Sequence, residues 1–176
     1  MKEKLLKLIP EFNLIQNEEL KDKVIKVWEK AIKQGNWSVD GLTEIPFTLV
    51  LKDTKINFVE HIRAVVGVCE KVEKVIKEIY GNKVKINRDY LIAGALLHDI
   101  GKLVEFEKKD GGFQKSEAGK SLRHPFSGVG LCYDEGIPHE IMHIIAVHSK
   151  EGDTGKRTPE AAILHHADFS NFDIFV

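Results

Sequence analysis

Cysteine is scarce in this 176-residue sequence, and its two cysteines lie far apart. Cys69 and Cys132 form neither a CxxC pair nor the dense framework that stabilises small secreted domains. We therefore expect two free, buried thiols. The same scarcity argues against a metal site built from thiolate ligands.

The sequence also lacks an excess of charge of either sign and any long apolar run. Its 26 basic and 27 acidic residues give a formal charge of -1, so no global field attracts nucleic acid or an anionic membrane. Charges and a proline interrupt the first residues, MKEKLLKLIPEFNL, which therefore do not resemble a signal peptide. We expect a soluble cytoplasmic protein with no nucleic-acid or membrane partner. Nothing in the sequence indicates its oligomeric state.

Helical periodicity dominates a chain that is 43% hydrophobic. The pattern predicts an all-α protein, a compact bundle of about five or six helices in a single domain, with residues 1–55 as an N-terminal helical segment and connector packed on a core domain of residues 56–176. Apolar spacing, caps and glycine or proline stops place the helices at about 20–35, 56–80, 87–101, 124–136, 138–149 and from 158 onwards.

Two connecting segments are longer than the others. Residues 35–54 lose the helical pattern, and TEIPFTLVL within them reads either as a short strand or as an extended connector, with Pro46 excluding a central strand. We treat the segment as a linker packed on the core. Residues 105–120 are polar and contain glycine, which predicts a long exposed loop, either a solvated connector or a lid over a substrate.

The dipeptide His98-Asp99 follows the apolar run from Leu91 to Leu97. Burying two titratable groups in such a helix costs several kcal/mol unless each has a partner, and a bound metal ion is the simplest one. Imidazole and carboxylate ligands suit divalent iron, manganese, zinc, cobalt or nickel. We expect one ion to be held by His61, His98, Asp99 and Asp168, and a second, bridged by Asp99, by His124 and His148.

This ordered set resembles the signature of the HD-domain metal-dependent phosphohydrolase superfamily. His98-Asp99 stands in LLHDIGK, and the resemblance covers about residues 56–170. His124, in HPFSG, and His148, in AVHS, resemble the additional ligands of binuclear members such as the HD-GYP cyclic-dinucleotide phosphodiesterases and the bacterial diadenosine-tetraphosphate hydrolases. No GYP tripeptide follows a downstream histidine, which argues against a cyclic-dinucleotide substrate.

Several cationic residues are predicted to contact the substrate. We expect Asp99 and Lys102 to be catalytic, with Lys102 contacting phosphate oxygens, although its charge would equally favour the C-terminal end of a helix. Weaker candidates for substrate binding lie near the ligands in sequence: Arg123, Lys150 and Arg157.

The remaining histidines divide between one supporting role and ordinary surface positions. His165 is expected to support Asp168 from outside the ligand set. The other histidines, His139, His143 and His166, are read as surface or packing residues.

The resemblance implies hydrolysis of a phosphate ester or anhydride of a nucleotide or related small metabolite, by a hydroxide that one or two metal ions activate. Two alternatives stay open. One is a di-iron oxygenase built on the same ligands, which would consume dioxygen. The other is a regulatory module that binds a nucleotide without turnover.

Overall fold

The computed structural model describes residues 1–51 and 54–175, so two residues of the predicted connector, 52–53, and the last residue, 176, lie outside the described part. Its elements run in chain order as α1 Lys2–Leu8, α2 Glu18–Gln34, α3 Phe58–Tyr80, α4 Arg88–Leu97, α5 Lys102–Glu105, β1 Phe106–Lys109, β2 Gly112–Lys115, α6 Glu117–Ser121, α7 His124–Asp134, α8 His139–Val147 and α9 Pro159–Asp173. Short 3₁₀ segments occur at Pro10–Leu14, Asp40–Thr43, Gly81–Lys83 and Lys150–Gly152.

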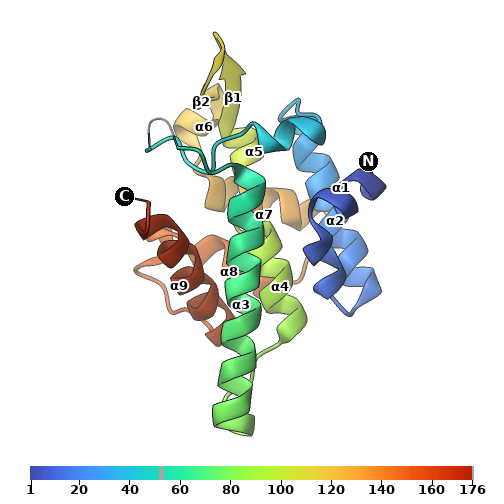
Figure 1. Ribbon diagram of the computed structural model, residues 1–176, viewed down its shortest axis with the longest axis vertical. Coiled ribbons are helices and arrows are strands. Elements are labelled where there is room, and N and C mark those ends of the chain that lie inside the picture. Colours follow the sequence, from blue (N-terminus) through green and yellow to red (C-terminus); the bar gives the residue numbers. More distant parts are fainter. Residues whose placement is uncertain (52–53, 176) are drawn as a thin grey trace.

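The all-α prediction is confirmed. Figure 1 shows α3 as the long helix through the middle of the molecule, with α9 and α4 on either side of it. The predicted helices correspond to α2, α3, α4, α7, α8 and α9, whereas the short α1, α5 and α6 were not predicted. None of the helices in the described ranges combines the length and the apolarity needed to span a bilayer.

The central helix α4 is buried on every side, because all seven residues from Leu91 to Leu97 are buried. The prediction that this helix continues through Asp99 to Gly101 is wrong, since α4 ends at Leu97 with His98 as its C-cap. Nδ1 of His98 donates to the carbonyl of Ala95 at 2.7 Å. That carbonyl would otherwise accept the next helical hydrogen bond, so the side chain competes with the helix and a turn follows.

The first turn of α3 is fixed by a capping box, and its last turn is exposed. Asn57 and Glu60 form a capping box, which fixes the start of the helix one turn before His61. Ile79, near the end of this helix, is 68% exposed. The end of α3 extends beyond its neighbours (Figure 1), so its terminal apolar residues have no core to contact.

The prediction of a long exposed loop at 105–120 is wrong in that the segment forms regular elements, although most of its residues are exposed or half-buried. Glu105 ends α5, and an antiparallel hairpin follows in which Lys109 pairs with Gly112 before the chain forms α6. The turn residues Asp110 and Gly111 have positive φ values of 51° and 80°, as a two-residue hairpin turn requires. The Asp-Gly pair is the signal for this hairpin, and the polar composition around it obscured that signal.

The N-terminal segment packs on α4. Leu5, Ile9 and Phe12 are fully buried in the same hydrophobic cluster as the rest of the chain, and Trp28 donates from Nε1 to the Leu96 carbonyl at 3.0 Å. The division of the chain at residues 55 and 56 stays a prediction. The connector after α2 contains no strand in its described residues beyond a single bridge between Pro46 and Asn57.

Candidate metal centre

Six side chains predicted as metal ligands come from five parts of the fold and meet in its interior. His61 lies on α3, His98 and Asp99 in the turn after α4, His124 at the start of α7, His148 at the end of α8 and Asp168 on α9. The four histidines and Asp99 are at most 5% exposed. Their identity as ligands stays a prediction, but the structure brings all six together.

The first group surrounds Nε2 of His61. This atom lies 3.1 Å from Oδ1 of Asp168, 3.4 Å from Oδ2 of Asp99 and 3.4 Å from Nε2 of His98. Oδ2 of Asp99 is also 3.4 Å from Nε2 of His98. Two nitrogen and two oxygen atoms therefore converge from α3, α9 and the turn that follows α4.

The second group surrounds the other oxygen of Asp99. Oδ1 lies 3.2 Å from Nε2 of His124 and 3.7 Å from Nε2 of His148. The ligand atoms of each trio, His61–His98–Asp99 and Asp99–His124–His148, all lie within 4.8 Å of one another. One carboxylate thus points its two oxygens at two separate histidine pairs, which is the geometry of a bridging ligand.

The protonation of the imidazoles fits a cation between them. His98 and His148 both cap their helices and donate from Nδ1 to a carbonyl three residues earlier, at 2.7 Å and 2.6 Å. His124 directs Nδ1 to the Glu105 carboxylate at 3.0 Å. In neutral rings the proton is then on Nδ1, so Nε2 carries a lone pair. Nε2 of His124 and of His148 nevertheless lie 3.3 Å apart, a contact between two acceptors that a metal ion would satisfy.

The charges at the centre favour ionised carboxylates. Burial raises the pKa of Asp99, but the Lys102 ammonium and His98 outweigh it and hold this pKa well below its ordinary value. Burial likewise raises the pKa of Asp168, and its hydrogen bond with His61 lowers it to about 2. Burial lowers the pKa of His124 to about 4, which keeps its imidazole neutral at neutral pH. Ionised carboxylates beside the neutral His124 imidazole are donors that suit a divalent cation.

Glu105 is a residue that sequence reasoning missed, because it was assigned to an exposed loop. Its side chain is 0% exposed and accepts hydrogen bonds from the backbone nitrogen and from Nδ1 of His124, at 2.7 Å and 3.0 Å. The helical spacing from Lys102 to Glu105 gave no sign of burial, since these residues form a single turn. Only the packing of α5 against α7 reveals this partner.

A cavity of about 420 Å³ opens beside the centre. It is lined by four cationic side chains, Lys102, Lys115, Arg123 and Lys150, and by four of the six predicted ligands, His61, Asp99, His124 and Asp168. Thr48, Glu105 and Ser149 also line it, together with apolar side chains, namely Phe47, Leu49, Val50, Phe106, Phe169 and Phe172. The cavity is therefore lined by both cationic and aromatic side chains.

The predicted substrate-binding cations have different surroundings. Lys102 donates to Oδ2 of Asp99 at 2.5 Å and to the Phe47 carbonyl at 2.7 Å. Arg157 does not line the cavity. Its guanidinium donates to the carbonyls of Val147 and Ser149 and to the Asp153 carboxylate, which anchors the loop after α8.

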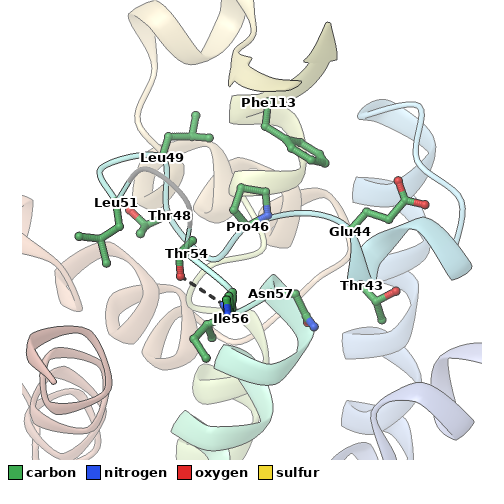
Figure 2. Close-up of a pocket in the computed structure, with 11 residues that line it drawn as sticks. Thr43, Glu44, Pro46, Thr48, Leu49, Leu51, Thr54, Ile56, Asn57 and Phe113 are labelled. Carbon is green, nitrogen blue, oxygen red and sulfur yellow. Dashed lines mark hydrogen bonds between the residues drawn. The ribbon is translucent and has the colours of Figure 1, made fainter. Parts of the chain in front are cut away.

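A second cavity, shown in Figure 2, lies on the connector and contains none of the predicted ligands. It is about 400 Å³ in volume and is lined by Phe113 of β2 and by residues on both sides of the segment 52–53, namely Thr43, Glu44, Pro46, Thr48, Leu49, Leu51, Thr54, Lys55, Ile56 and Asn57. Thr48 and Leu49 line both cavities. The connector was predicted as a linker packed on the core, and the ring centroid of its Phe47 lies 5.1 Å from that of His61.

Comparison with protein-family models gives one match, to the HD domain, over residues 58–169. This range covers most of the chain and includes all six residues of the centre. The chain belongs to the HD-domain metal-dependent phosphohydrolase superfamily. It is therefore a hydrolase of a family that binds divalent metal ions.

A curated relative of this HD-domain protein is the dihydroneopterin 2′,3′-cyclic phosphate phosphodiesterase of Methanocaldococcus jannaschii. The two are 34% identical over 178 residues, which cover 94% of this chain and 67% of the relative. No solved structure matched the chain.

The remaining histidines of this HD-domain protein lie outside the ligand set. His165 was expected to support Asp168, but Nδ1 of His165 instead donates to the backbone carbonyl of His148 at 2.7 Å. His165 therefore contacts the main chain of a different predicted ligand, His148, at the end of α8. His139 is exposed, His143 is partly buried and His166 is exposed, and none of them joins either trio.

Proposed function

We propose that the protein hydrolyses a 2′,3′-cyclic phosphodiester attached to a planar heterocycle, with dihydroneopterin 2′,3′-cyclic phosphate as the first substrate to test. The observation that carries this proposal is the similarity to the Methanocaldococcus jannaschii phosphodiesterase, which covers 94% of this chain. The cavity supports it, because it offers cations for a phosphate and aromatic side chains for a ring system.

We further propose a binuclear centre. His61, His98, Asp168 and Oδ2 of Asp99 would hold one ion, and His124, His148 and Oδ1 of Asp99 the other. The donor set suits iron, manganese, cobalt, nickel or zinc. When bound, such a pair of ions supplies positive charge for the phosphoryl oxygens and lowers the pKa of a water molecule.

The chain's own residues would bind and orient the substrate. Lys102 reaches the same oxygen of Asp99 that faces His61, so its ammonium lies where a phosphate oxygen would approach the centre. Arg123 and Lys150 line the same cavity and would bind the other phosphate oxygens. Phe47 and Phe172, whose ring centroids are 6.0 Å apart, would contact the heterocycle and exclude water from the centre.

The test combines metal analysis with a substrate panel. Anaerobically purified protein should contain nearly two transition-metal ions per chain and open the cyclic phosphate of dihydroneopterin or of a nucleoside. Asp99→Ala should lose both metal and turnover, because it removes the bridging carboxylate. Turnover by a metal-depleted Asp99→Ala protein, or inactivity of the metal-loaded wild type on every cyclic phosphate, would contradict the proposal.

The same experiment separates the two other functions that the ligands permit. Turnover supported by manganese or zinc without dioxygen uptake fits hydrolysis and opposes a di-iron oxygenase. Tight binding of a nucleotide without any product would indicate a regulatory module. We also propose a cytoplasmic location, which fractionation of cells that express the full-length protein would test.

A further inference from the structure

Glu105 connects two parts of the site that are otherwise separate. Its Oε2 atom accepts from both the backbone nitrogen and Nδ1 of His124. Its Oε1 atom accepts from Arg123 at 2.9 Å and lies 3.3 Å from the ammonium of Lys115. One buried carboxylate therefore contacts a predicted ligand of the second ion with one oxygen and two cavity cations with the other.

The position of this carboxylate is fixed by the backbone around it. The carbonyl of Glu105 accepts from the nitrogen of Ser116 at 2.8 Å, which closes the hairpin onto α5. Gly119 of α6 approaches so closely that a Cβ atom there would lie 2.2 Å from the same carbonyl oxygen. Because α5 and α6 hold Glu105 in place, its side chain can hold His124 and Arg123 in turn.

We propose that Glu105 is a positioning residue that couples the second metal position to the recognition of phosphate by Arg123 and Lys115. The inference rests on the proposed binuclear centre. A carboxylate on Nδ1 fixes the tautomer and orientation of a metal-binding imidazole and increases its basicity, and loss of such a partner commonly lowers metal affinity about 10–100-fold. The same carboxylate accepts a hydrogen bond from Arg123 and lies 3.3 Å from the Lys115 ammonium, so it orients both cations at the cavity.

Glu151 offers a matched control. It accepts from Nε of Arg123 at 2.8 Å but makes no contact with His124 among the described hydrogen bonds and ion pairs. Glu105→Gln should therefore disturb both metal and phosphate binding, whereas Glu151→Gln should disturb phosphate binding alone. Both substitutions keep the size of the side chain and remove its charge.

The experiment is a calorimetric titration of metal-free protein with Mn²⁺, followed by titration of the Mn²⁺-saturated protein with inorganic phosphate. In Glu105→Gln the first Mn²⁺ should bind as in wild type, the second about 10–100-fold more weakly, and phosphate more weakly. In Glu151→Gln both Mn²⁺ affinities should equal those of wild type while phosphate binding weakens. Adding His124→Ala to Glu105→Gln should lower the second affinity no further than His124→Ala alone, since Glu105 acts through that ring.

The outcomes distinguish this inference from the proposed function. A second Mn²⁺ affinity unchanged in Glu105→Gln, or lowered equally in Glu151→Gln, overturns the positioning role while the binuclear centre stands. Additive effects of Glu105→Gln and His124→Ala overturn it as well. Wild-type protein that binds fewer than two Mn²⁺ ions overturns the proposed binuclear centre and the inference with it. Circular dichroism and thermal denaturation of the metal-free variants verify that each one folds.

Discussion

Lys102 places its ammonium nitrogen 2.5 Å from Oδ2 of Asp99, and the two side chains are only 12% and 2% exposed. The pair lies three residues apart across the turn that follows α4. Oδ2, the oxygen that Lys102 contacts, also faces His61 and His98, whereas Oδ1 faces His124 and His148. The lysine of the LLHDIGK sequence is thus part of the centre.

Replacing Lys102 should therefore impair turnover more than metal binding. In Lys102→Gln we expect kcat to fall about 100-fold, the usual order for the loss of one charged or hydrogen-bonding group that stabilises a transition state. Lys102→Arg keeps the charge and should recover part of the rate. Steady-state kinetics with metal analysis of the same samples provides the measurement. A wild-type kcat in Lys102→Gln would exclude a catalytic role.

The two histidine pairs should be separable by mutation. His124→Ala combined with His148→Ala removes the nitrogen ligands around Oδ1 of Asp99 and should lower the stoichiometry from two ions towards one. The first group, with His61 and Asp168, stays intact in this variant and should retain its ion. Elemental analysis after dialysis measures the outcome. If the double variant still holds two ions, these histidines are not ligands.

Gly101, the N-cap of α5, lies against the first turns of α7. A Cβ atom at this position would lie 2.2 Å from the His124 carbonyl and 2.8 Å from the nitrogen of Gly128. Since both atoms belong to the backbone, Gly101→Ala should displace α7 and lower the free energy of unfolding by about 1–3 kcal/mol, the usual cost of overpacking. It should also weaken metal binding by moving His124.

Gly67 is the matched control for this substitution. It lies inside α3, and a Cβ atom there would meet no atom within 4 Å. Gly67→Ala should raise the stability by up to about 1 kcal/mol through helix propensity. Urea denaturation of the metal-free proteins compares the two. Equal stability of Gly101→Ala and wild type would show that the backbone yields at this contact.

Stability of the metal-free protein should depend on pH through Glu105. Burial raises the pKa of this carboxyl, but the hydrogen bond and charge of His124 and the charge of Arg123 outweigh burial and lower the pKa from 4.5 to about 2. A lowered folded-state pKa stabilises the protein above about pH 4.5, and this contribution is lost as the pH falls from 4.5 towards 2.

The comparison with Glu105→Gln isolates this contribution, because the glutamine does not titrate. Wild type should exceed the variant in stability at pH 6, and the difference should shrink as the pH falls below 4.5. Denaturation curves at several pH values measure the difference directly. A difference that stays constant over this range would show that Glu105 is not ionised in the folded protein.

The inward position of several predicted ligands could be inferred from the sequence, because they follow or lie beside an apolar helical pattern. His98 and Asp99 come directly after seven buried residues, and His148 follows the apolar face of α8 in the same way. Periodicity alone indicates that such side chains point inward, and buried titratable groups need partners. Periodicity does not show at which residue a helix ends. His98 ends α4 through its own side chain, which the apolar run did not reveal.

Glu105 and Phe47 show why the rest was not predictable. Both come from segments without periodicity, and both are fully buried because distant elements cover them: Glu105 lies against α7, and Phe47 lies between His61 and Phe172. Burial of a residue in a short turn depends on what packs over it, which local sequence does not encode. The hairpin had a local signal in Asp110-Gly111, but its role in carrying Lys115 towards Glu105 depends on contacts across the chain.

Local sequence patterns predicted the helical class of this protein, the family and the six side chains that the structure brings together, because amphipathic patterns and the chemistry of histidine and carboxylate are local properties. Tertiary structure alone decided how the two oxygens of Asp99 are shared between the histidine pairs, which cations line the cavity and which carboxylate supports His124. These features depend on distances between helices that are far apart in the chain, and such distances are set by packing.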